Sequence, residues 1–251
     1  SRQWEHQRLA AFRAMAQGRT RLIAATVEGL LQRTLPPEEL EAHTVALDAK
    51  GSYDPEELAG RLAALGYTRC QQVEGVGQFA LRGGILDFFS PAHPQPVRME
   101  LFGDEVDSMG LFDVSTQRRT VQLDEARILP AAEVLPQLAG GGLAGLCAAL
   151  DKEMAAAEKK GTPDGLLTTL RQDREMLANG LSFPAIDRYL ALIYPKLSTA
   201  VDYLPEDATV LISESPRFME RCKNYLWQLN EDVTALTESG TLAARLGTFC
   251  A

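Results

Sequence analysis

The sequence lacks the residue spacings that hold metal ions or build disulfide frameworks. None of its four cysteines forms a CxxC pair, so neither a zinc site nor a set of disulfides is indicated. The three histidines stand far apart, without the HExxH spacing of a metalloprotease helix. We therefore expect reduced thiols in a cytoplasmic protein, with no metal ion and no cofactor.

Motifs for nucleotide binding and catalysis are absent as well. No GxxxxGK[ST] run is present, whose backbone amides and lysine would cradle nucleotide phosphates, and there is no GxSxG nucleophile motif. Carboxylates are plentiful, as in FGDEVDSMGLFDV, but their abundance does not make a paired acid and base. The sequence therefore predicts a binding module, either whole or as part of an enzyme whose motor lies elsewhere, and not an enzyme in itself.

The chain also lacks an excess of positive charge and any long apolar run. A net charge of −9 argues against a protein whose main role is to wrap nucleic acid. No apolar run reaches the roughly 18 residues that would span a bilayer, and SRQWEHQRLAAF lacks the apolar core of a signal peptide. The opening inside an amphipathic pattern, without a methionine, leads us to expect a fragment of a longer protein.

The two outer sections of the chain alternate between helical and strand patterns. In the first, a helix is expected over residues 4–16, a strand over 21–26 and a short helix after it. In the last, helical periodicity follows the glycine-rich stretch at 131–145, and the apolar run 208–215 predicts a strand before a final helix. We predict that residues 1–42 and 131–251 fold together as an α/β domain.

The middle section, residues 43–130, has a different pattern. Its one helix, over residues 55–65, is punctuated by Asp54 as N-cap, Pro55 at the first position and Gly66 as the stop. Apolar residues then alternate with polar ones, which predicts strands near 67–73, 77–82, 85–90, 96–102, 105–113 and 119–123. This pattern predicts a smaller α+β domain in which a curved antiparallel sheet packs against the helix.

Alternation assigns the charged residues of this sheet to one face. In GQFALRG and PVRMELF the apolar side chains fall on one side, which leaves Arg82, Arg98 and Glu100 on the other. Arg69 would join them if the strand near 67–73 pairs nearby. The adjacent Gly83-Gly84 pair would let the chain bend so that Arg82 stands clear of its neighbours.

Two interpretations of this charged face remain open on the pattern alone. In the first, the side chains only keep a half-exposed sheet soluble, and Arg98 pairs with Glu100 for on the order of a few tenths of a kcal/mol. In the second, the arginines form a protein-docking patch, because a guanidinium group binds carboxylates through two hydrogen bonds and arginine is enriched at interfaces.

A family resemblance bears on this choice. The run VEGVGQFALRGGILDFFSP, followed by PVRMELFGDEVDSMGLFDVSTQRRT and ILPAAEVLP, resembles the amino-terminal part of bacterial transcription-repair coupling factors. It is more distantly similar to the matching domain of the repair protein UvrB. The resemblance extends back through RLIAATVEGLLQRTLPPEEL and, more weakly, forward through YLALIYPKLSTAVDYLPEDATVLISE, so it covers nearly the whole chain.

The resemblance implies a particular domain organisation and role. It implies a partial helicase-like domain 1 of RecA/Rossmann type, split into domain 1a (residues 1–42) and domain 1b (131–251) around domain 2 (43–130). The family recruits UvrA, the damage-recognition ATPase, to stalled RNA polymerase in transcription-coupled nucleotide excision repair. RNA polymerase and DNA would be bound only through parts outside this chain, and the full-length parent is expected to be an ATP-dependent DNA translocase.

The match to UvrB also implies which residues contact UvrA. They are Arg69, Arg82 and Arg98, with Glu100 beside the last. Ala80 stands where UvrB has a further arginine, so one contact is expected to be missing. The alternative function is a regulatory or autoinhibitory one, in which another domain of the full-length protein masks the same face.

Overall fold

The computed structural model describes residues 2–159, 161, 164–181, 183, 185–243 and 246. The chain divides into two compact units, each assembled from two separate stretches of sequence. Ser1–Arg19 and Pro37–Glu133 make the first unit, and Thr20–Pro36 and Val134–Ala251 make the second. The division into residues 1–42, 43–130 and 131–251 stays a prediction. The first nineteen residues belong to the same compact unit as residues 37–133.

The helices of the first unit follow from local sequence signals. The helical period of the first residues gives α1 (Arg2–Ala16), as predicted. The side chain of Asp54 accepts hydrogen bonds from two backbone amides in the first turn of α4 (Pro55–Ala64), and Gly66 takes a positive φ of 86° just past its end. The short α3 (Pro37–Ala42) was not predicted, although proline is tolerated in the first turn of a helix.

Six strands form the main sheet of the first unit, in chain order from one edge to the other. All neighbours are antiparallel except β2 and β3, which run parallel, so the antiparallel prediction is wrong at that edge. Two further strands, β1 and β8, form a separate antiparallel pair, and β8 was not predicted. The strands are β1 (Val45–Asp48), β2 (Thr68–Arg69), β3 (Gln78–Arg82), β4 (Ile85–Phe88), β5 (Val97–Phe102), β6 (Glu105–Phe112), β7 (Arg119–Gln122) and β8 (Glu125–Ile128).

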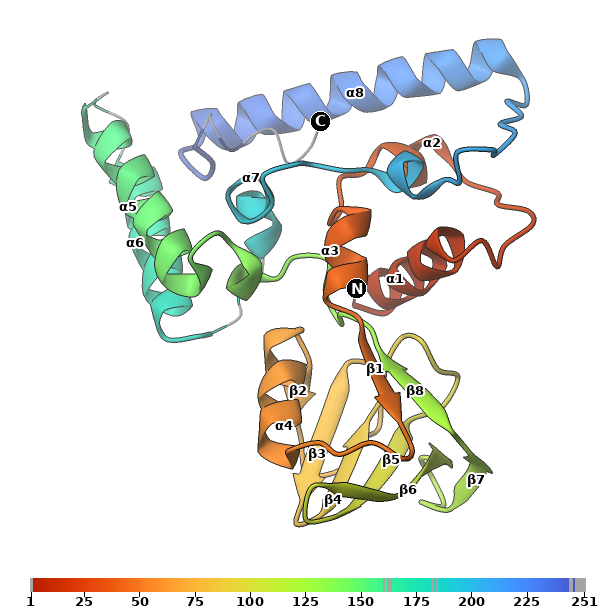
Figure 1. The fold of residues 1–251 in the computed structure, drawn as a ribbon. Helices are drawn as coiled ribbons and strands as arrows, with labels where there is room; N and C mark the ends of the chain where they lie inside the picture. Colours follow the sequence, from red (N-terminus) through yellow and green to blue (C-terminus); the bar gives the residue numbers. More distant parts are fainter. Residues whose placement is uncertain are drawn as a thin grey trace. The chain divides into compact units, whose positions relative to one another are not determined.

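The apolar face of the main sheet lies in the core of the first unit. Leu86, Met99 and Met109 face one another across β4, β5 and β6, and all three are fully buried. Leu58 and Leu62 of α4 are buried too, and Figure 1 shows α4 lying against the sheet beside β2 and β3. Burial of each such side chain contributes about 1.5–3 kcal/mol to stability. The apolar residues that alternate along the strands are therefore a main source of the stability of this unit.

The second unit is mostly helical. The side chain of Thr26 caps α2, and an ion pair between Glu28 and Arg221 ties α2 to α8. Two longer helices, α5 and α6, lie side by side (Figure 1). Among the described residues, no helix has the length and apolar character needed to cross a membrane. The elements are α2 (Val27–Leu31), η1 (Pro136–Leu138), α5 (Gly142–Lys159), α6 (Asp164–Ala178), η2 (Ile186–Tyr189), α7 (Leu190–Ile193), η3 (Ala200–Tyr203) and α8 (Ser215–Glu238).

Two predicted strands of the outer sections are not strands in the structure. Residues 21–26 and 208–214 run without any strand pairing, and Leu22 and Leu211 are 85% and 90% exposed. A strand needs a neighbour to take up its backbone amides and carbonyls, and no other described segment pairs with either stretch. The chain therefore mixes helices and a curved sheet as predicted, whereas the helicase-like arrangement of the outer sections stays a prediction.

Candidate protein-docking face

The face of the main sheet opposite the apolar one gathers charged side chains from neighbouring strands. Strand register places Ala80, Asp87 and Arg98 side by side across β3, β4 and β5, and Arg82 and Glu100 lie one row further along. Residues paired across strands project to the same side, so these side chains share a face, as the alternation predicted. We call the following set the arginine face: Arg82, Asp87, Arg98, Glu100 and Arg119.

Asp87 is the centre of this face, although the sequence did not single it out. Its side chain is only 1% exposed, and both of its oxygens are taken by arginines. Arg98 binds it through two bonds, from Nε to Oδ1 at 2.7 Å and from Nη2 to Oδ2 at 2.8 Å. Arg82 donates from Nη2 to Oδ2 at 2.7 Å. One buried carboxylate therefore holds two of the three predicted contact arginines.

Arg98 is largely occupied by contacts inside the chain. Its Nη1 donates to the backbone carbonyl of Gln117 at 3.2 Å and its Nη2 to the side-chain oxygen of Gln117 at 2.9 Å. The guanidinium carbon lies 4.4 Å from the centre of the Phe112 ring. The hydrogen bond to Asp87 raises the pKa of Arg98 above its ordinary value. With a side chain only 17% exposed, Arg98 is less available to a partner than the outward position in the sequence suggested.

Arg82 is the more accessible of the two arginines. Its side chain is 48% exposed, and it is held by the bond to Asp87. It is the last residue of β3, just before the turn that joins β3 to β4. Gly83 has a positive φ of 59°, and a Cβ on Gly84 would meet the backbone oxygen of Leu101 at 2.4 Å. The two glycines are thus required by the turn that leaves Arg82 at the edge of the face.

Glu100 pairs with a residue that the sequence analysis missed. Arg119, the first residue of β7, brings its Nη2 to 3.3 Å from Glu100 Oε1, and it donates to the Ser108 hydroxyl at 2.7 Å. That hydroxyl in turn donates to Glu100 Oε2 at 2.9 Å. The suggested pairing of Arg98 with Glu100 is therefore wrong. The sequence signal for Arg119 was the pair of adjacent arginines in TQRRT. Which of the two lies on the arginine face depends on how β6 pairs with β7.

A glycine makes room for Arg119. Gly110 lies next to Arg98 in the register of β5 and β6. A Cβ at Gly110 would approach Arg119 Cδ at 2.9 Å and the backbone oxygen of Val121 at 2.5 Å. The aliphatic part of Arg119 therefore lies over a position that has no side chain.

The structure does not bring Arg69 to the other arginines. In the parallel pairing of β2 with β3, Arg69 lies opposite Phe79, whose side chain belongs to the apolar face. Arg69 therefore projects to the opposite side of the sheet from Arg82. Ala80 is fully buried with Val73 and Phe112, so this position packs inside the chain and presents nothing to a partner.

Phe102 is an exposed aromatic side chain near the arginine face. It is the last residue of β5, two positions after Glu100, and it is 85% exposed. A register shift between Glu100 and Leu101 precedes it. Exposed aromatic residues beside arginines are typical of the central contacts in protein interfaces. The sequence signal was an aromatic residue directly before the Gly103-Asp104 turn.

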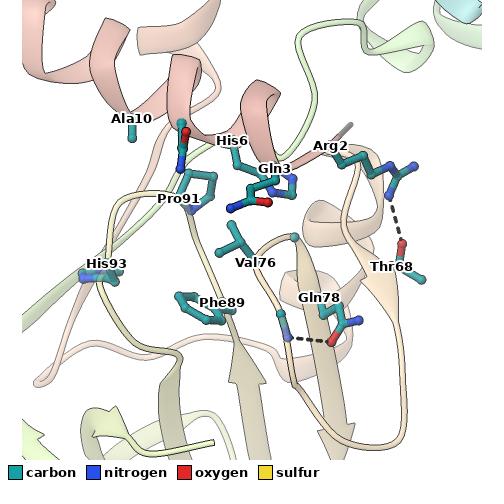
Figure 2. Close-up of a pocket in the computed structure, with 13 residues that line it drawn as sticks. Arg2, Gln3, His6, Ala10, Thr68, Val76, Gln78, Phe89, Pro91 and His93 are labelled. Carbon is teal, nitrogen blue, oxygen red and sulfur yellow. Dashed lines mark hydrogen bonds between the residues drawn. The ribbon is translucent and has the colours of Figure 1, made fainter.

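A separate cavity of about 590 Å³ lies between α1 and the loops that precede β3 and follow β4 (Figure 2). Two of its lining residues are histidines that already have backbone partners: His6 Nε2 lies 3.0 Å from the carbonyl oxygen of Ala131, and His93 Nε2 accepts from the amide of Arg127. Burial lowers the pKa of both rings. No cluster of potential metal ligands occurs among the residues that the structure describes.

Comparison with known proteins bears on the identity of this face. Residues 45–133, which include the whole arginine face, match the UvrB interaction domain family. Over 243 residues the chain is 30% identical to the transcription-repair-coupling factor of Bacillus subtilis, which covers 94% of this chain. The chain is homologous to the transcription-repair-coupling factors. This confirms the resemblance found in the sequence.

Other coupling factors match over a similar span. The factor of Myxococcus xanthus is 31% identical over 227 residues, or 88% of this chain, and that of Staphylococcus haemolyticus is 29% identical over 237 residues, or 93%. The chain spans only 18% to 20% of the length of these relatives. The arginine face lies within residues 45–133, the part of the chain that matches the UvrB interaction domain family.

Proposed function

We propose that this chain is the UvrA-docking module of a transcription-repair coupling factor and that the arginine face is its contact surface. The observation that carries the proposal is the buried Asp87, which holds Arg82 and Arg98 on rigid strands inside the UvrB interaction domain. A guanidinium group fixed in this way presents directed donors to a carboxylate at little cost in conformational entropy. The expected partner surface therefore carries acidic side chains.

The surroundings of Arg82 fit such a contact. Arg82 is half-exposed, and Phe102 offers a large apolar side chain beyond Glu100. Arginine and aromatic residues supply most of the binding energy in many interfaces. Arg119 extends the cationic part of the face towards the sheet edge. Arg69 is left out of this surface because its side of the sheet is different.

In the parent protein, the module would bring UvrA to RNA polymerase stalled at damage. We place contacts with RNA polymerase and DNA, and ATP-driven translocation, in parts of the parent outside this chain. The two outer sections would then act as a helicase-like domain 1 without catalytic activity, around a domain 2 at residues 43–130. This assignment extends the family resemblance and rests on the match of residues 45–133.

The proposal is tested by titrating UvrA with the chain and with its Arg82→Glu variant, using calorimetry. A reversed charge at a close contact weakens such complexes by several kcal/mol, so we expect affinity to fall by about 100-fold or more. The matched control is Arg61→Glu, which makes the same charge change at an exposed position on α4. Equal binding by the wild-type chain and the Arg82→Glu variant would refute the assigned surface.

A further inference from the structure

We infer that Asp87 is a positioning residue for partner binding: it holds Arg82 in its binding orientation without touching the partner. The inference rests on the proposed function, because it concerns how the same face binds UvrA. It goes beyond the contact residues themselves, since Asp87 is only 1% exposed and its oxygens are already engaged by Arg82 and Arg98. A partner can therefore sense Asp87 only through the arginines.

Arg98 holds the carboxylate from its other side. Arg98 donates two hydrogen bonds to Asp87. Its own position is held by a hydrogen bond to Gln117 and by a cation–π contact with the ring of Phe112. Gln117 adopts a positive φ of 60°, a conformation that costs energy in any residue with a side chain, while its carbonyl oxygen accepts from Arg98. Because both ends of this arrangement are anchored, the Oδ2 atom that receives Arg82 has a fixed place on the sheet.

The geometry leaves Arg82 donors for a second acceptor. One Nη2–H group points to Asp87, and a guanidinium group has five N–H donors in a fixed plane. A partner carboxylate can bind the remaining donors while the bond to Asp87 stays in place. Without Asp87, a half-exposed arginine samples many rotamers, and their loss on binding opposes association.

Charge alone predicts the opposite effect for Asp87. The arginine face carries three cations and two anions, so Asp87→Asn would make it more positive. If the face attracted an acidic partner only by its net charge, this substitution would tighten binding. If Asp87 positions Arg82, the same substitution weakens binding. The sign of the change therefore separates the two explanations.

The experiment measures UvrA binding by the 251-residue chain and by its Asp87→Asn variant, with the melting temperature of each recorded alongside. We expect binding about tenfold weaker for the variant, at a temperature where both proteins are folded. Asp107→Asn is the matched control, because it removes the same charge from an exposed position of β6 outside the arginine face. Unchanged or tighter binding by Asp87→Asn would overturn the inference.

A double-mutant cycle identifies the route by which Asp87 acts. In an Arg82→Ala background, Asp87→Asn should weaken binding less than twofold further, because the group that it positions is gone. Independent effects, whose fold-changes multiply, would show that Asp87 does not act through Arg82. A wild-type chain that fails to bind UvrA would remove the proposed function, and this inference with it.

A second variant covers the case in which Asp87→Asn does not fold. Arg82→Lys keeps the charge at a half-exposed position, but an ammonium group lacks the planar fork that can hold Asp87 and a partner carboxylate together. We expect several-fold weaker binding for Arg82→Lys with an unchanged melting temperature. Wild-type affinity would contradict the positioning role.

Discussion

Leu86 and Asp87 are neighbours on β4 and are almost equally buried, yet they belong to opposite faces of the sheet. Leu86 lies among apolar side chains, where its contribution depends on the area removed from water and very little on direction. Asp87 lies under two guanidinium groups, where its contribution depends on bond geometry. The comparison shows that burial by itself does not tell a residue that stabilises the fold from one that organises a binding surface.

The largest effect on stability is expected on the apolar face. Leu86→Ala should lower the free energy of unfolding by about 3 kcal/mol, because it removes buried methyl groups and leaves a cavity. Chemical denaturation of the first unit would measure this, and UvrA affinity below the unfolding transition should stay unchanged. A marked loss of UvrA affinity in the folded variant would show that the apolar face also contributes to binding, so the two faces would not have separate roles.

A smaller loss of stability is expected on the arginine face. Arg98→Met keeps much of the side-chain volume but leaves Asp87 with one arginine and removes both donors to Gln117. We expect a loss of about 2 kcal/mol, since a buried acceptor loses its main partner. Amide hydrogen exchange should also become faster in the loop from Asp113 to Arg118, which Arg98 holds. If the amides of this loop exchanged as slowly in the variant as in the wild-type chain, Arg98 would not be what holds the loop.

The smallest expected effect is the pH dependence of stability. It arises outside both faces of the main sheet, because no strand of this sheet contains a histidine. Burial lowers the pKa of His6 and His93 in the folded protein below the ordinary value of 6.5. As pH falls below about 6.5, the unfolded chain therefore takes up protons first, and the stability of the folded state decreases. Thermal melts between pH 7 and pH 5 would measure the slope.

A variant assigns this slope to a residue. Gln can accept from the Arg127 amide as His93 does, so His93→Gln should make the dependence shallower. Identical pH profiles for the wild-type chain and this variant would show that the acid sensitivity originates elsewhere.

The sequence predicted those features that depend on local signals. The cap at Asp54, most strands of the main sheet and the shared face of Arg82, Arg98 and Glu100 follow from period and punctuation within a few residues. Such signals act along one strand or one helix. They therefore do not require knowledge of which segments become neighbours.

Features that depend on pairing between segments could not be predicted. Asp87 becomes the shared acceptor only because β4 lies between β3 and β5 in one register. Arg69 falls on the other side because the register of β2 with β3 sets it opposite Phe79, a residue of the apolar face. Residues 21–26 and 208–214 have the apolar character of strands. A hydrophobic pattern shows that a segment could pair as a strand, but it does not show whether another segment lies beside it.

The empty position at Gly110 also restricts how this surface can be redesigned. Any side chain introduced there displaces the arm of Arg119 and strains the backbone at Val121. Shortening Arg119 would not by itself make room for a side chain at position 110, because a Cβ there would still meet the backbone oxygen of Val121 at 2.5 Å. An engineer who wishes to redirect the module to a different partner should keep this glycine and vary the residues around it.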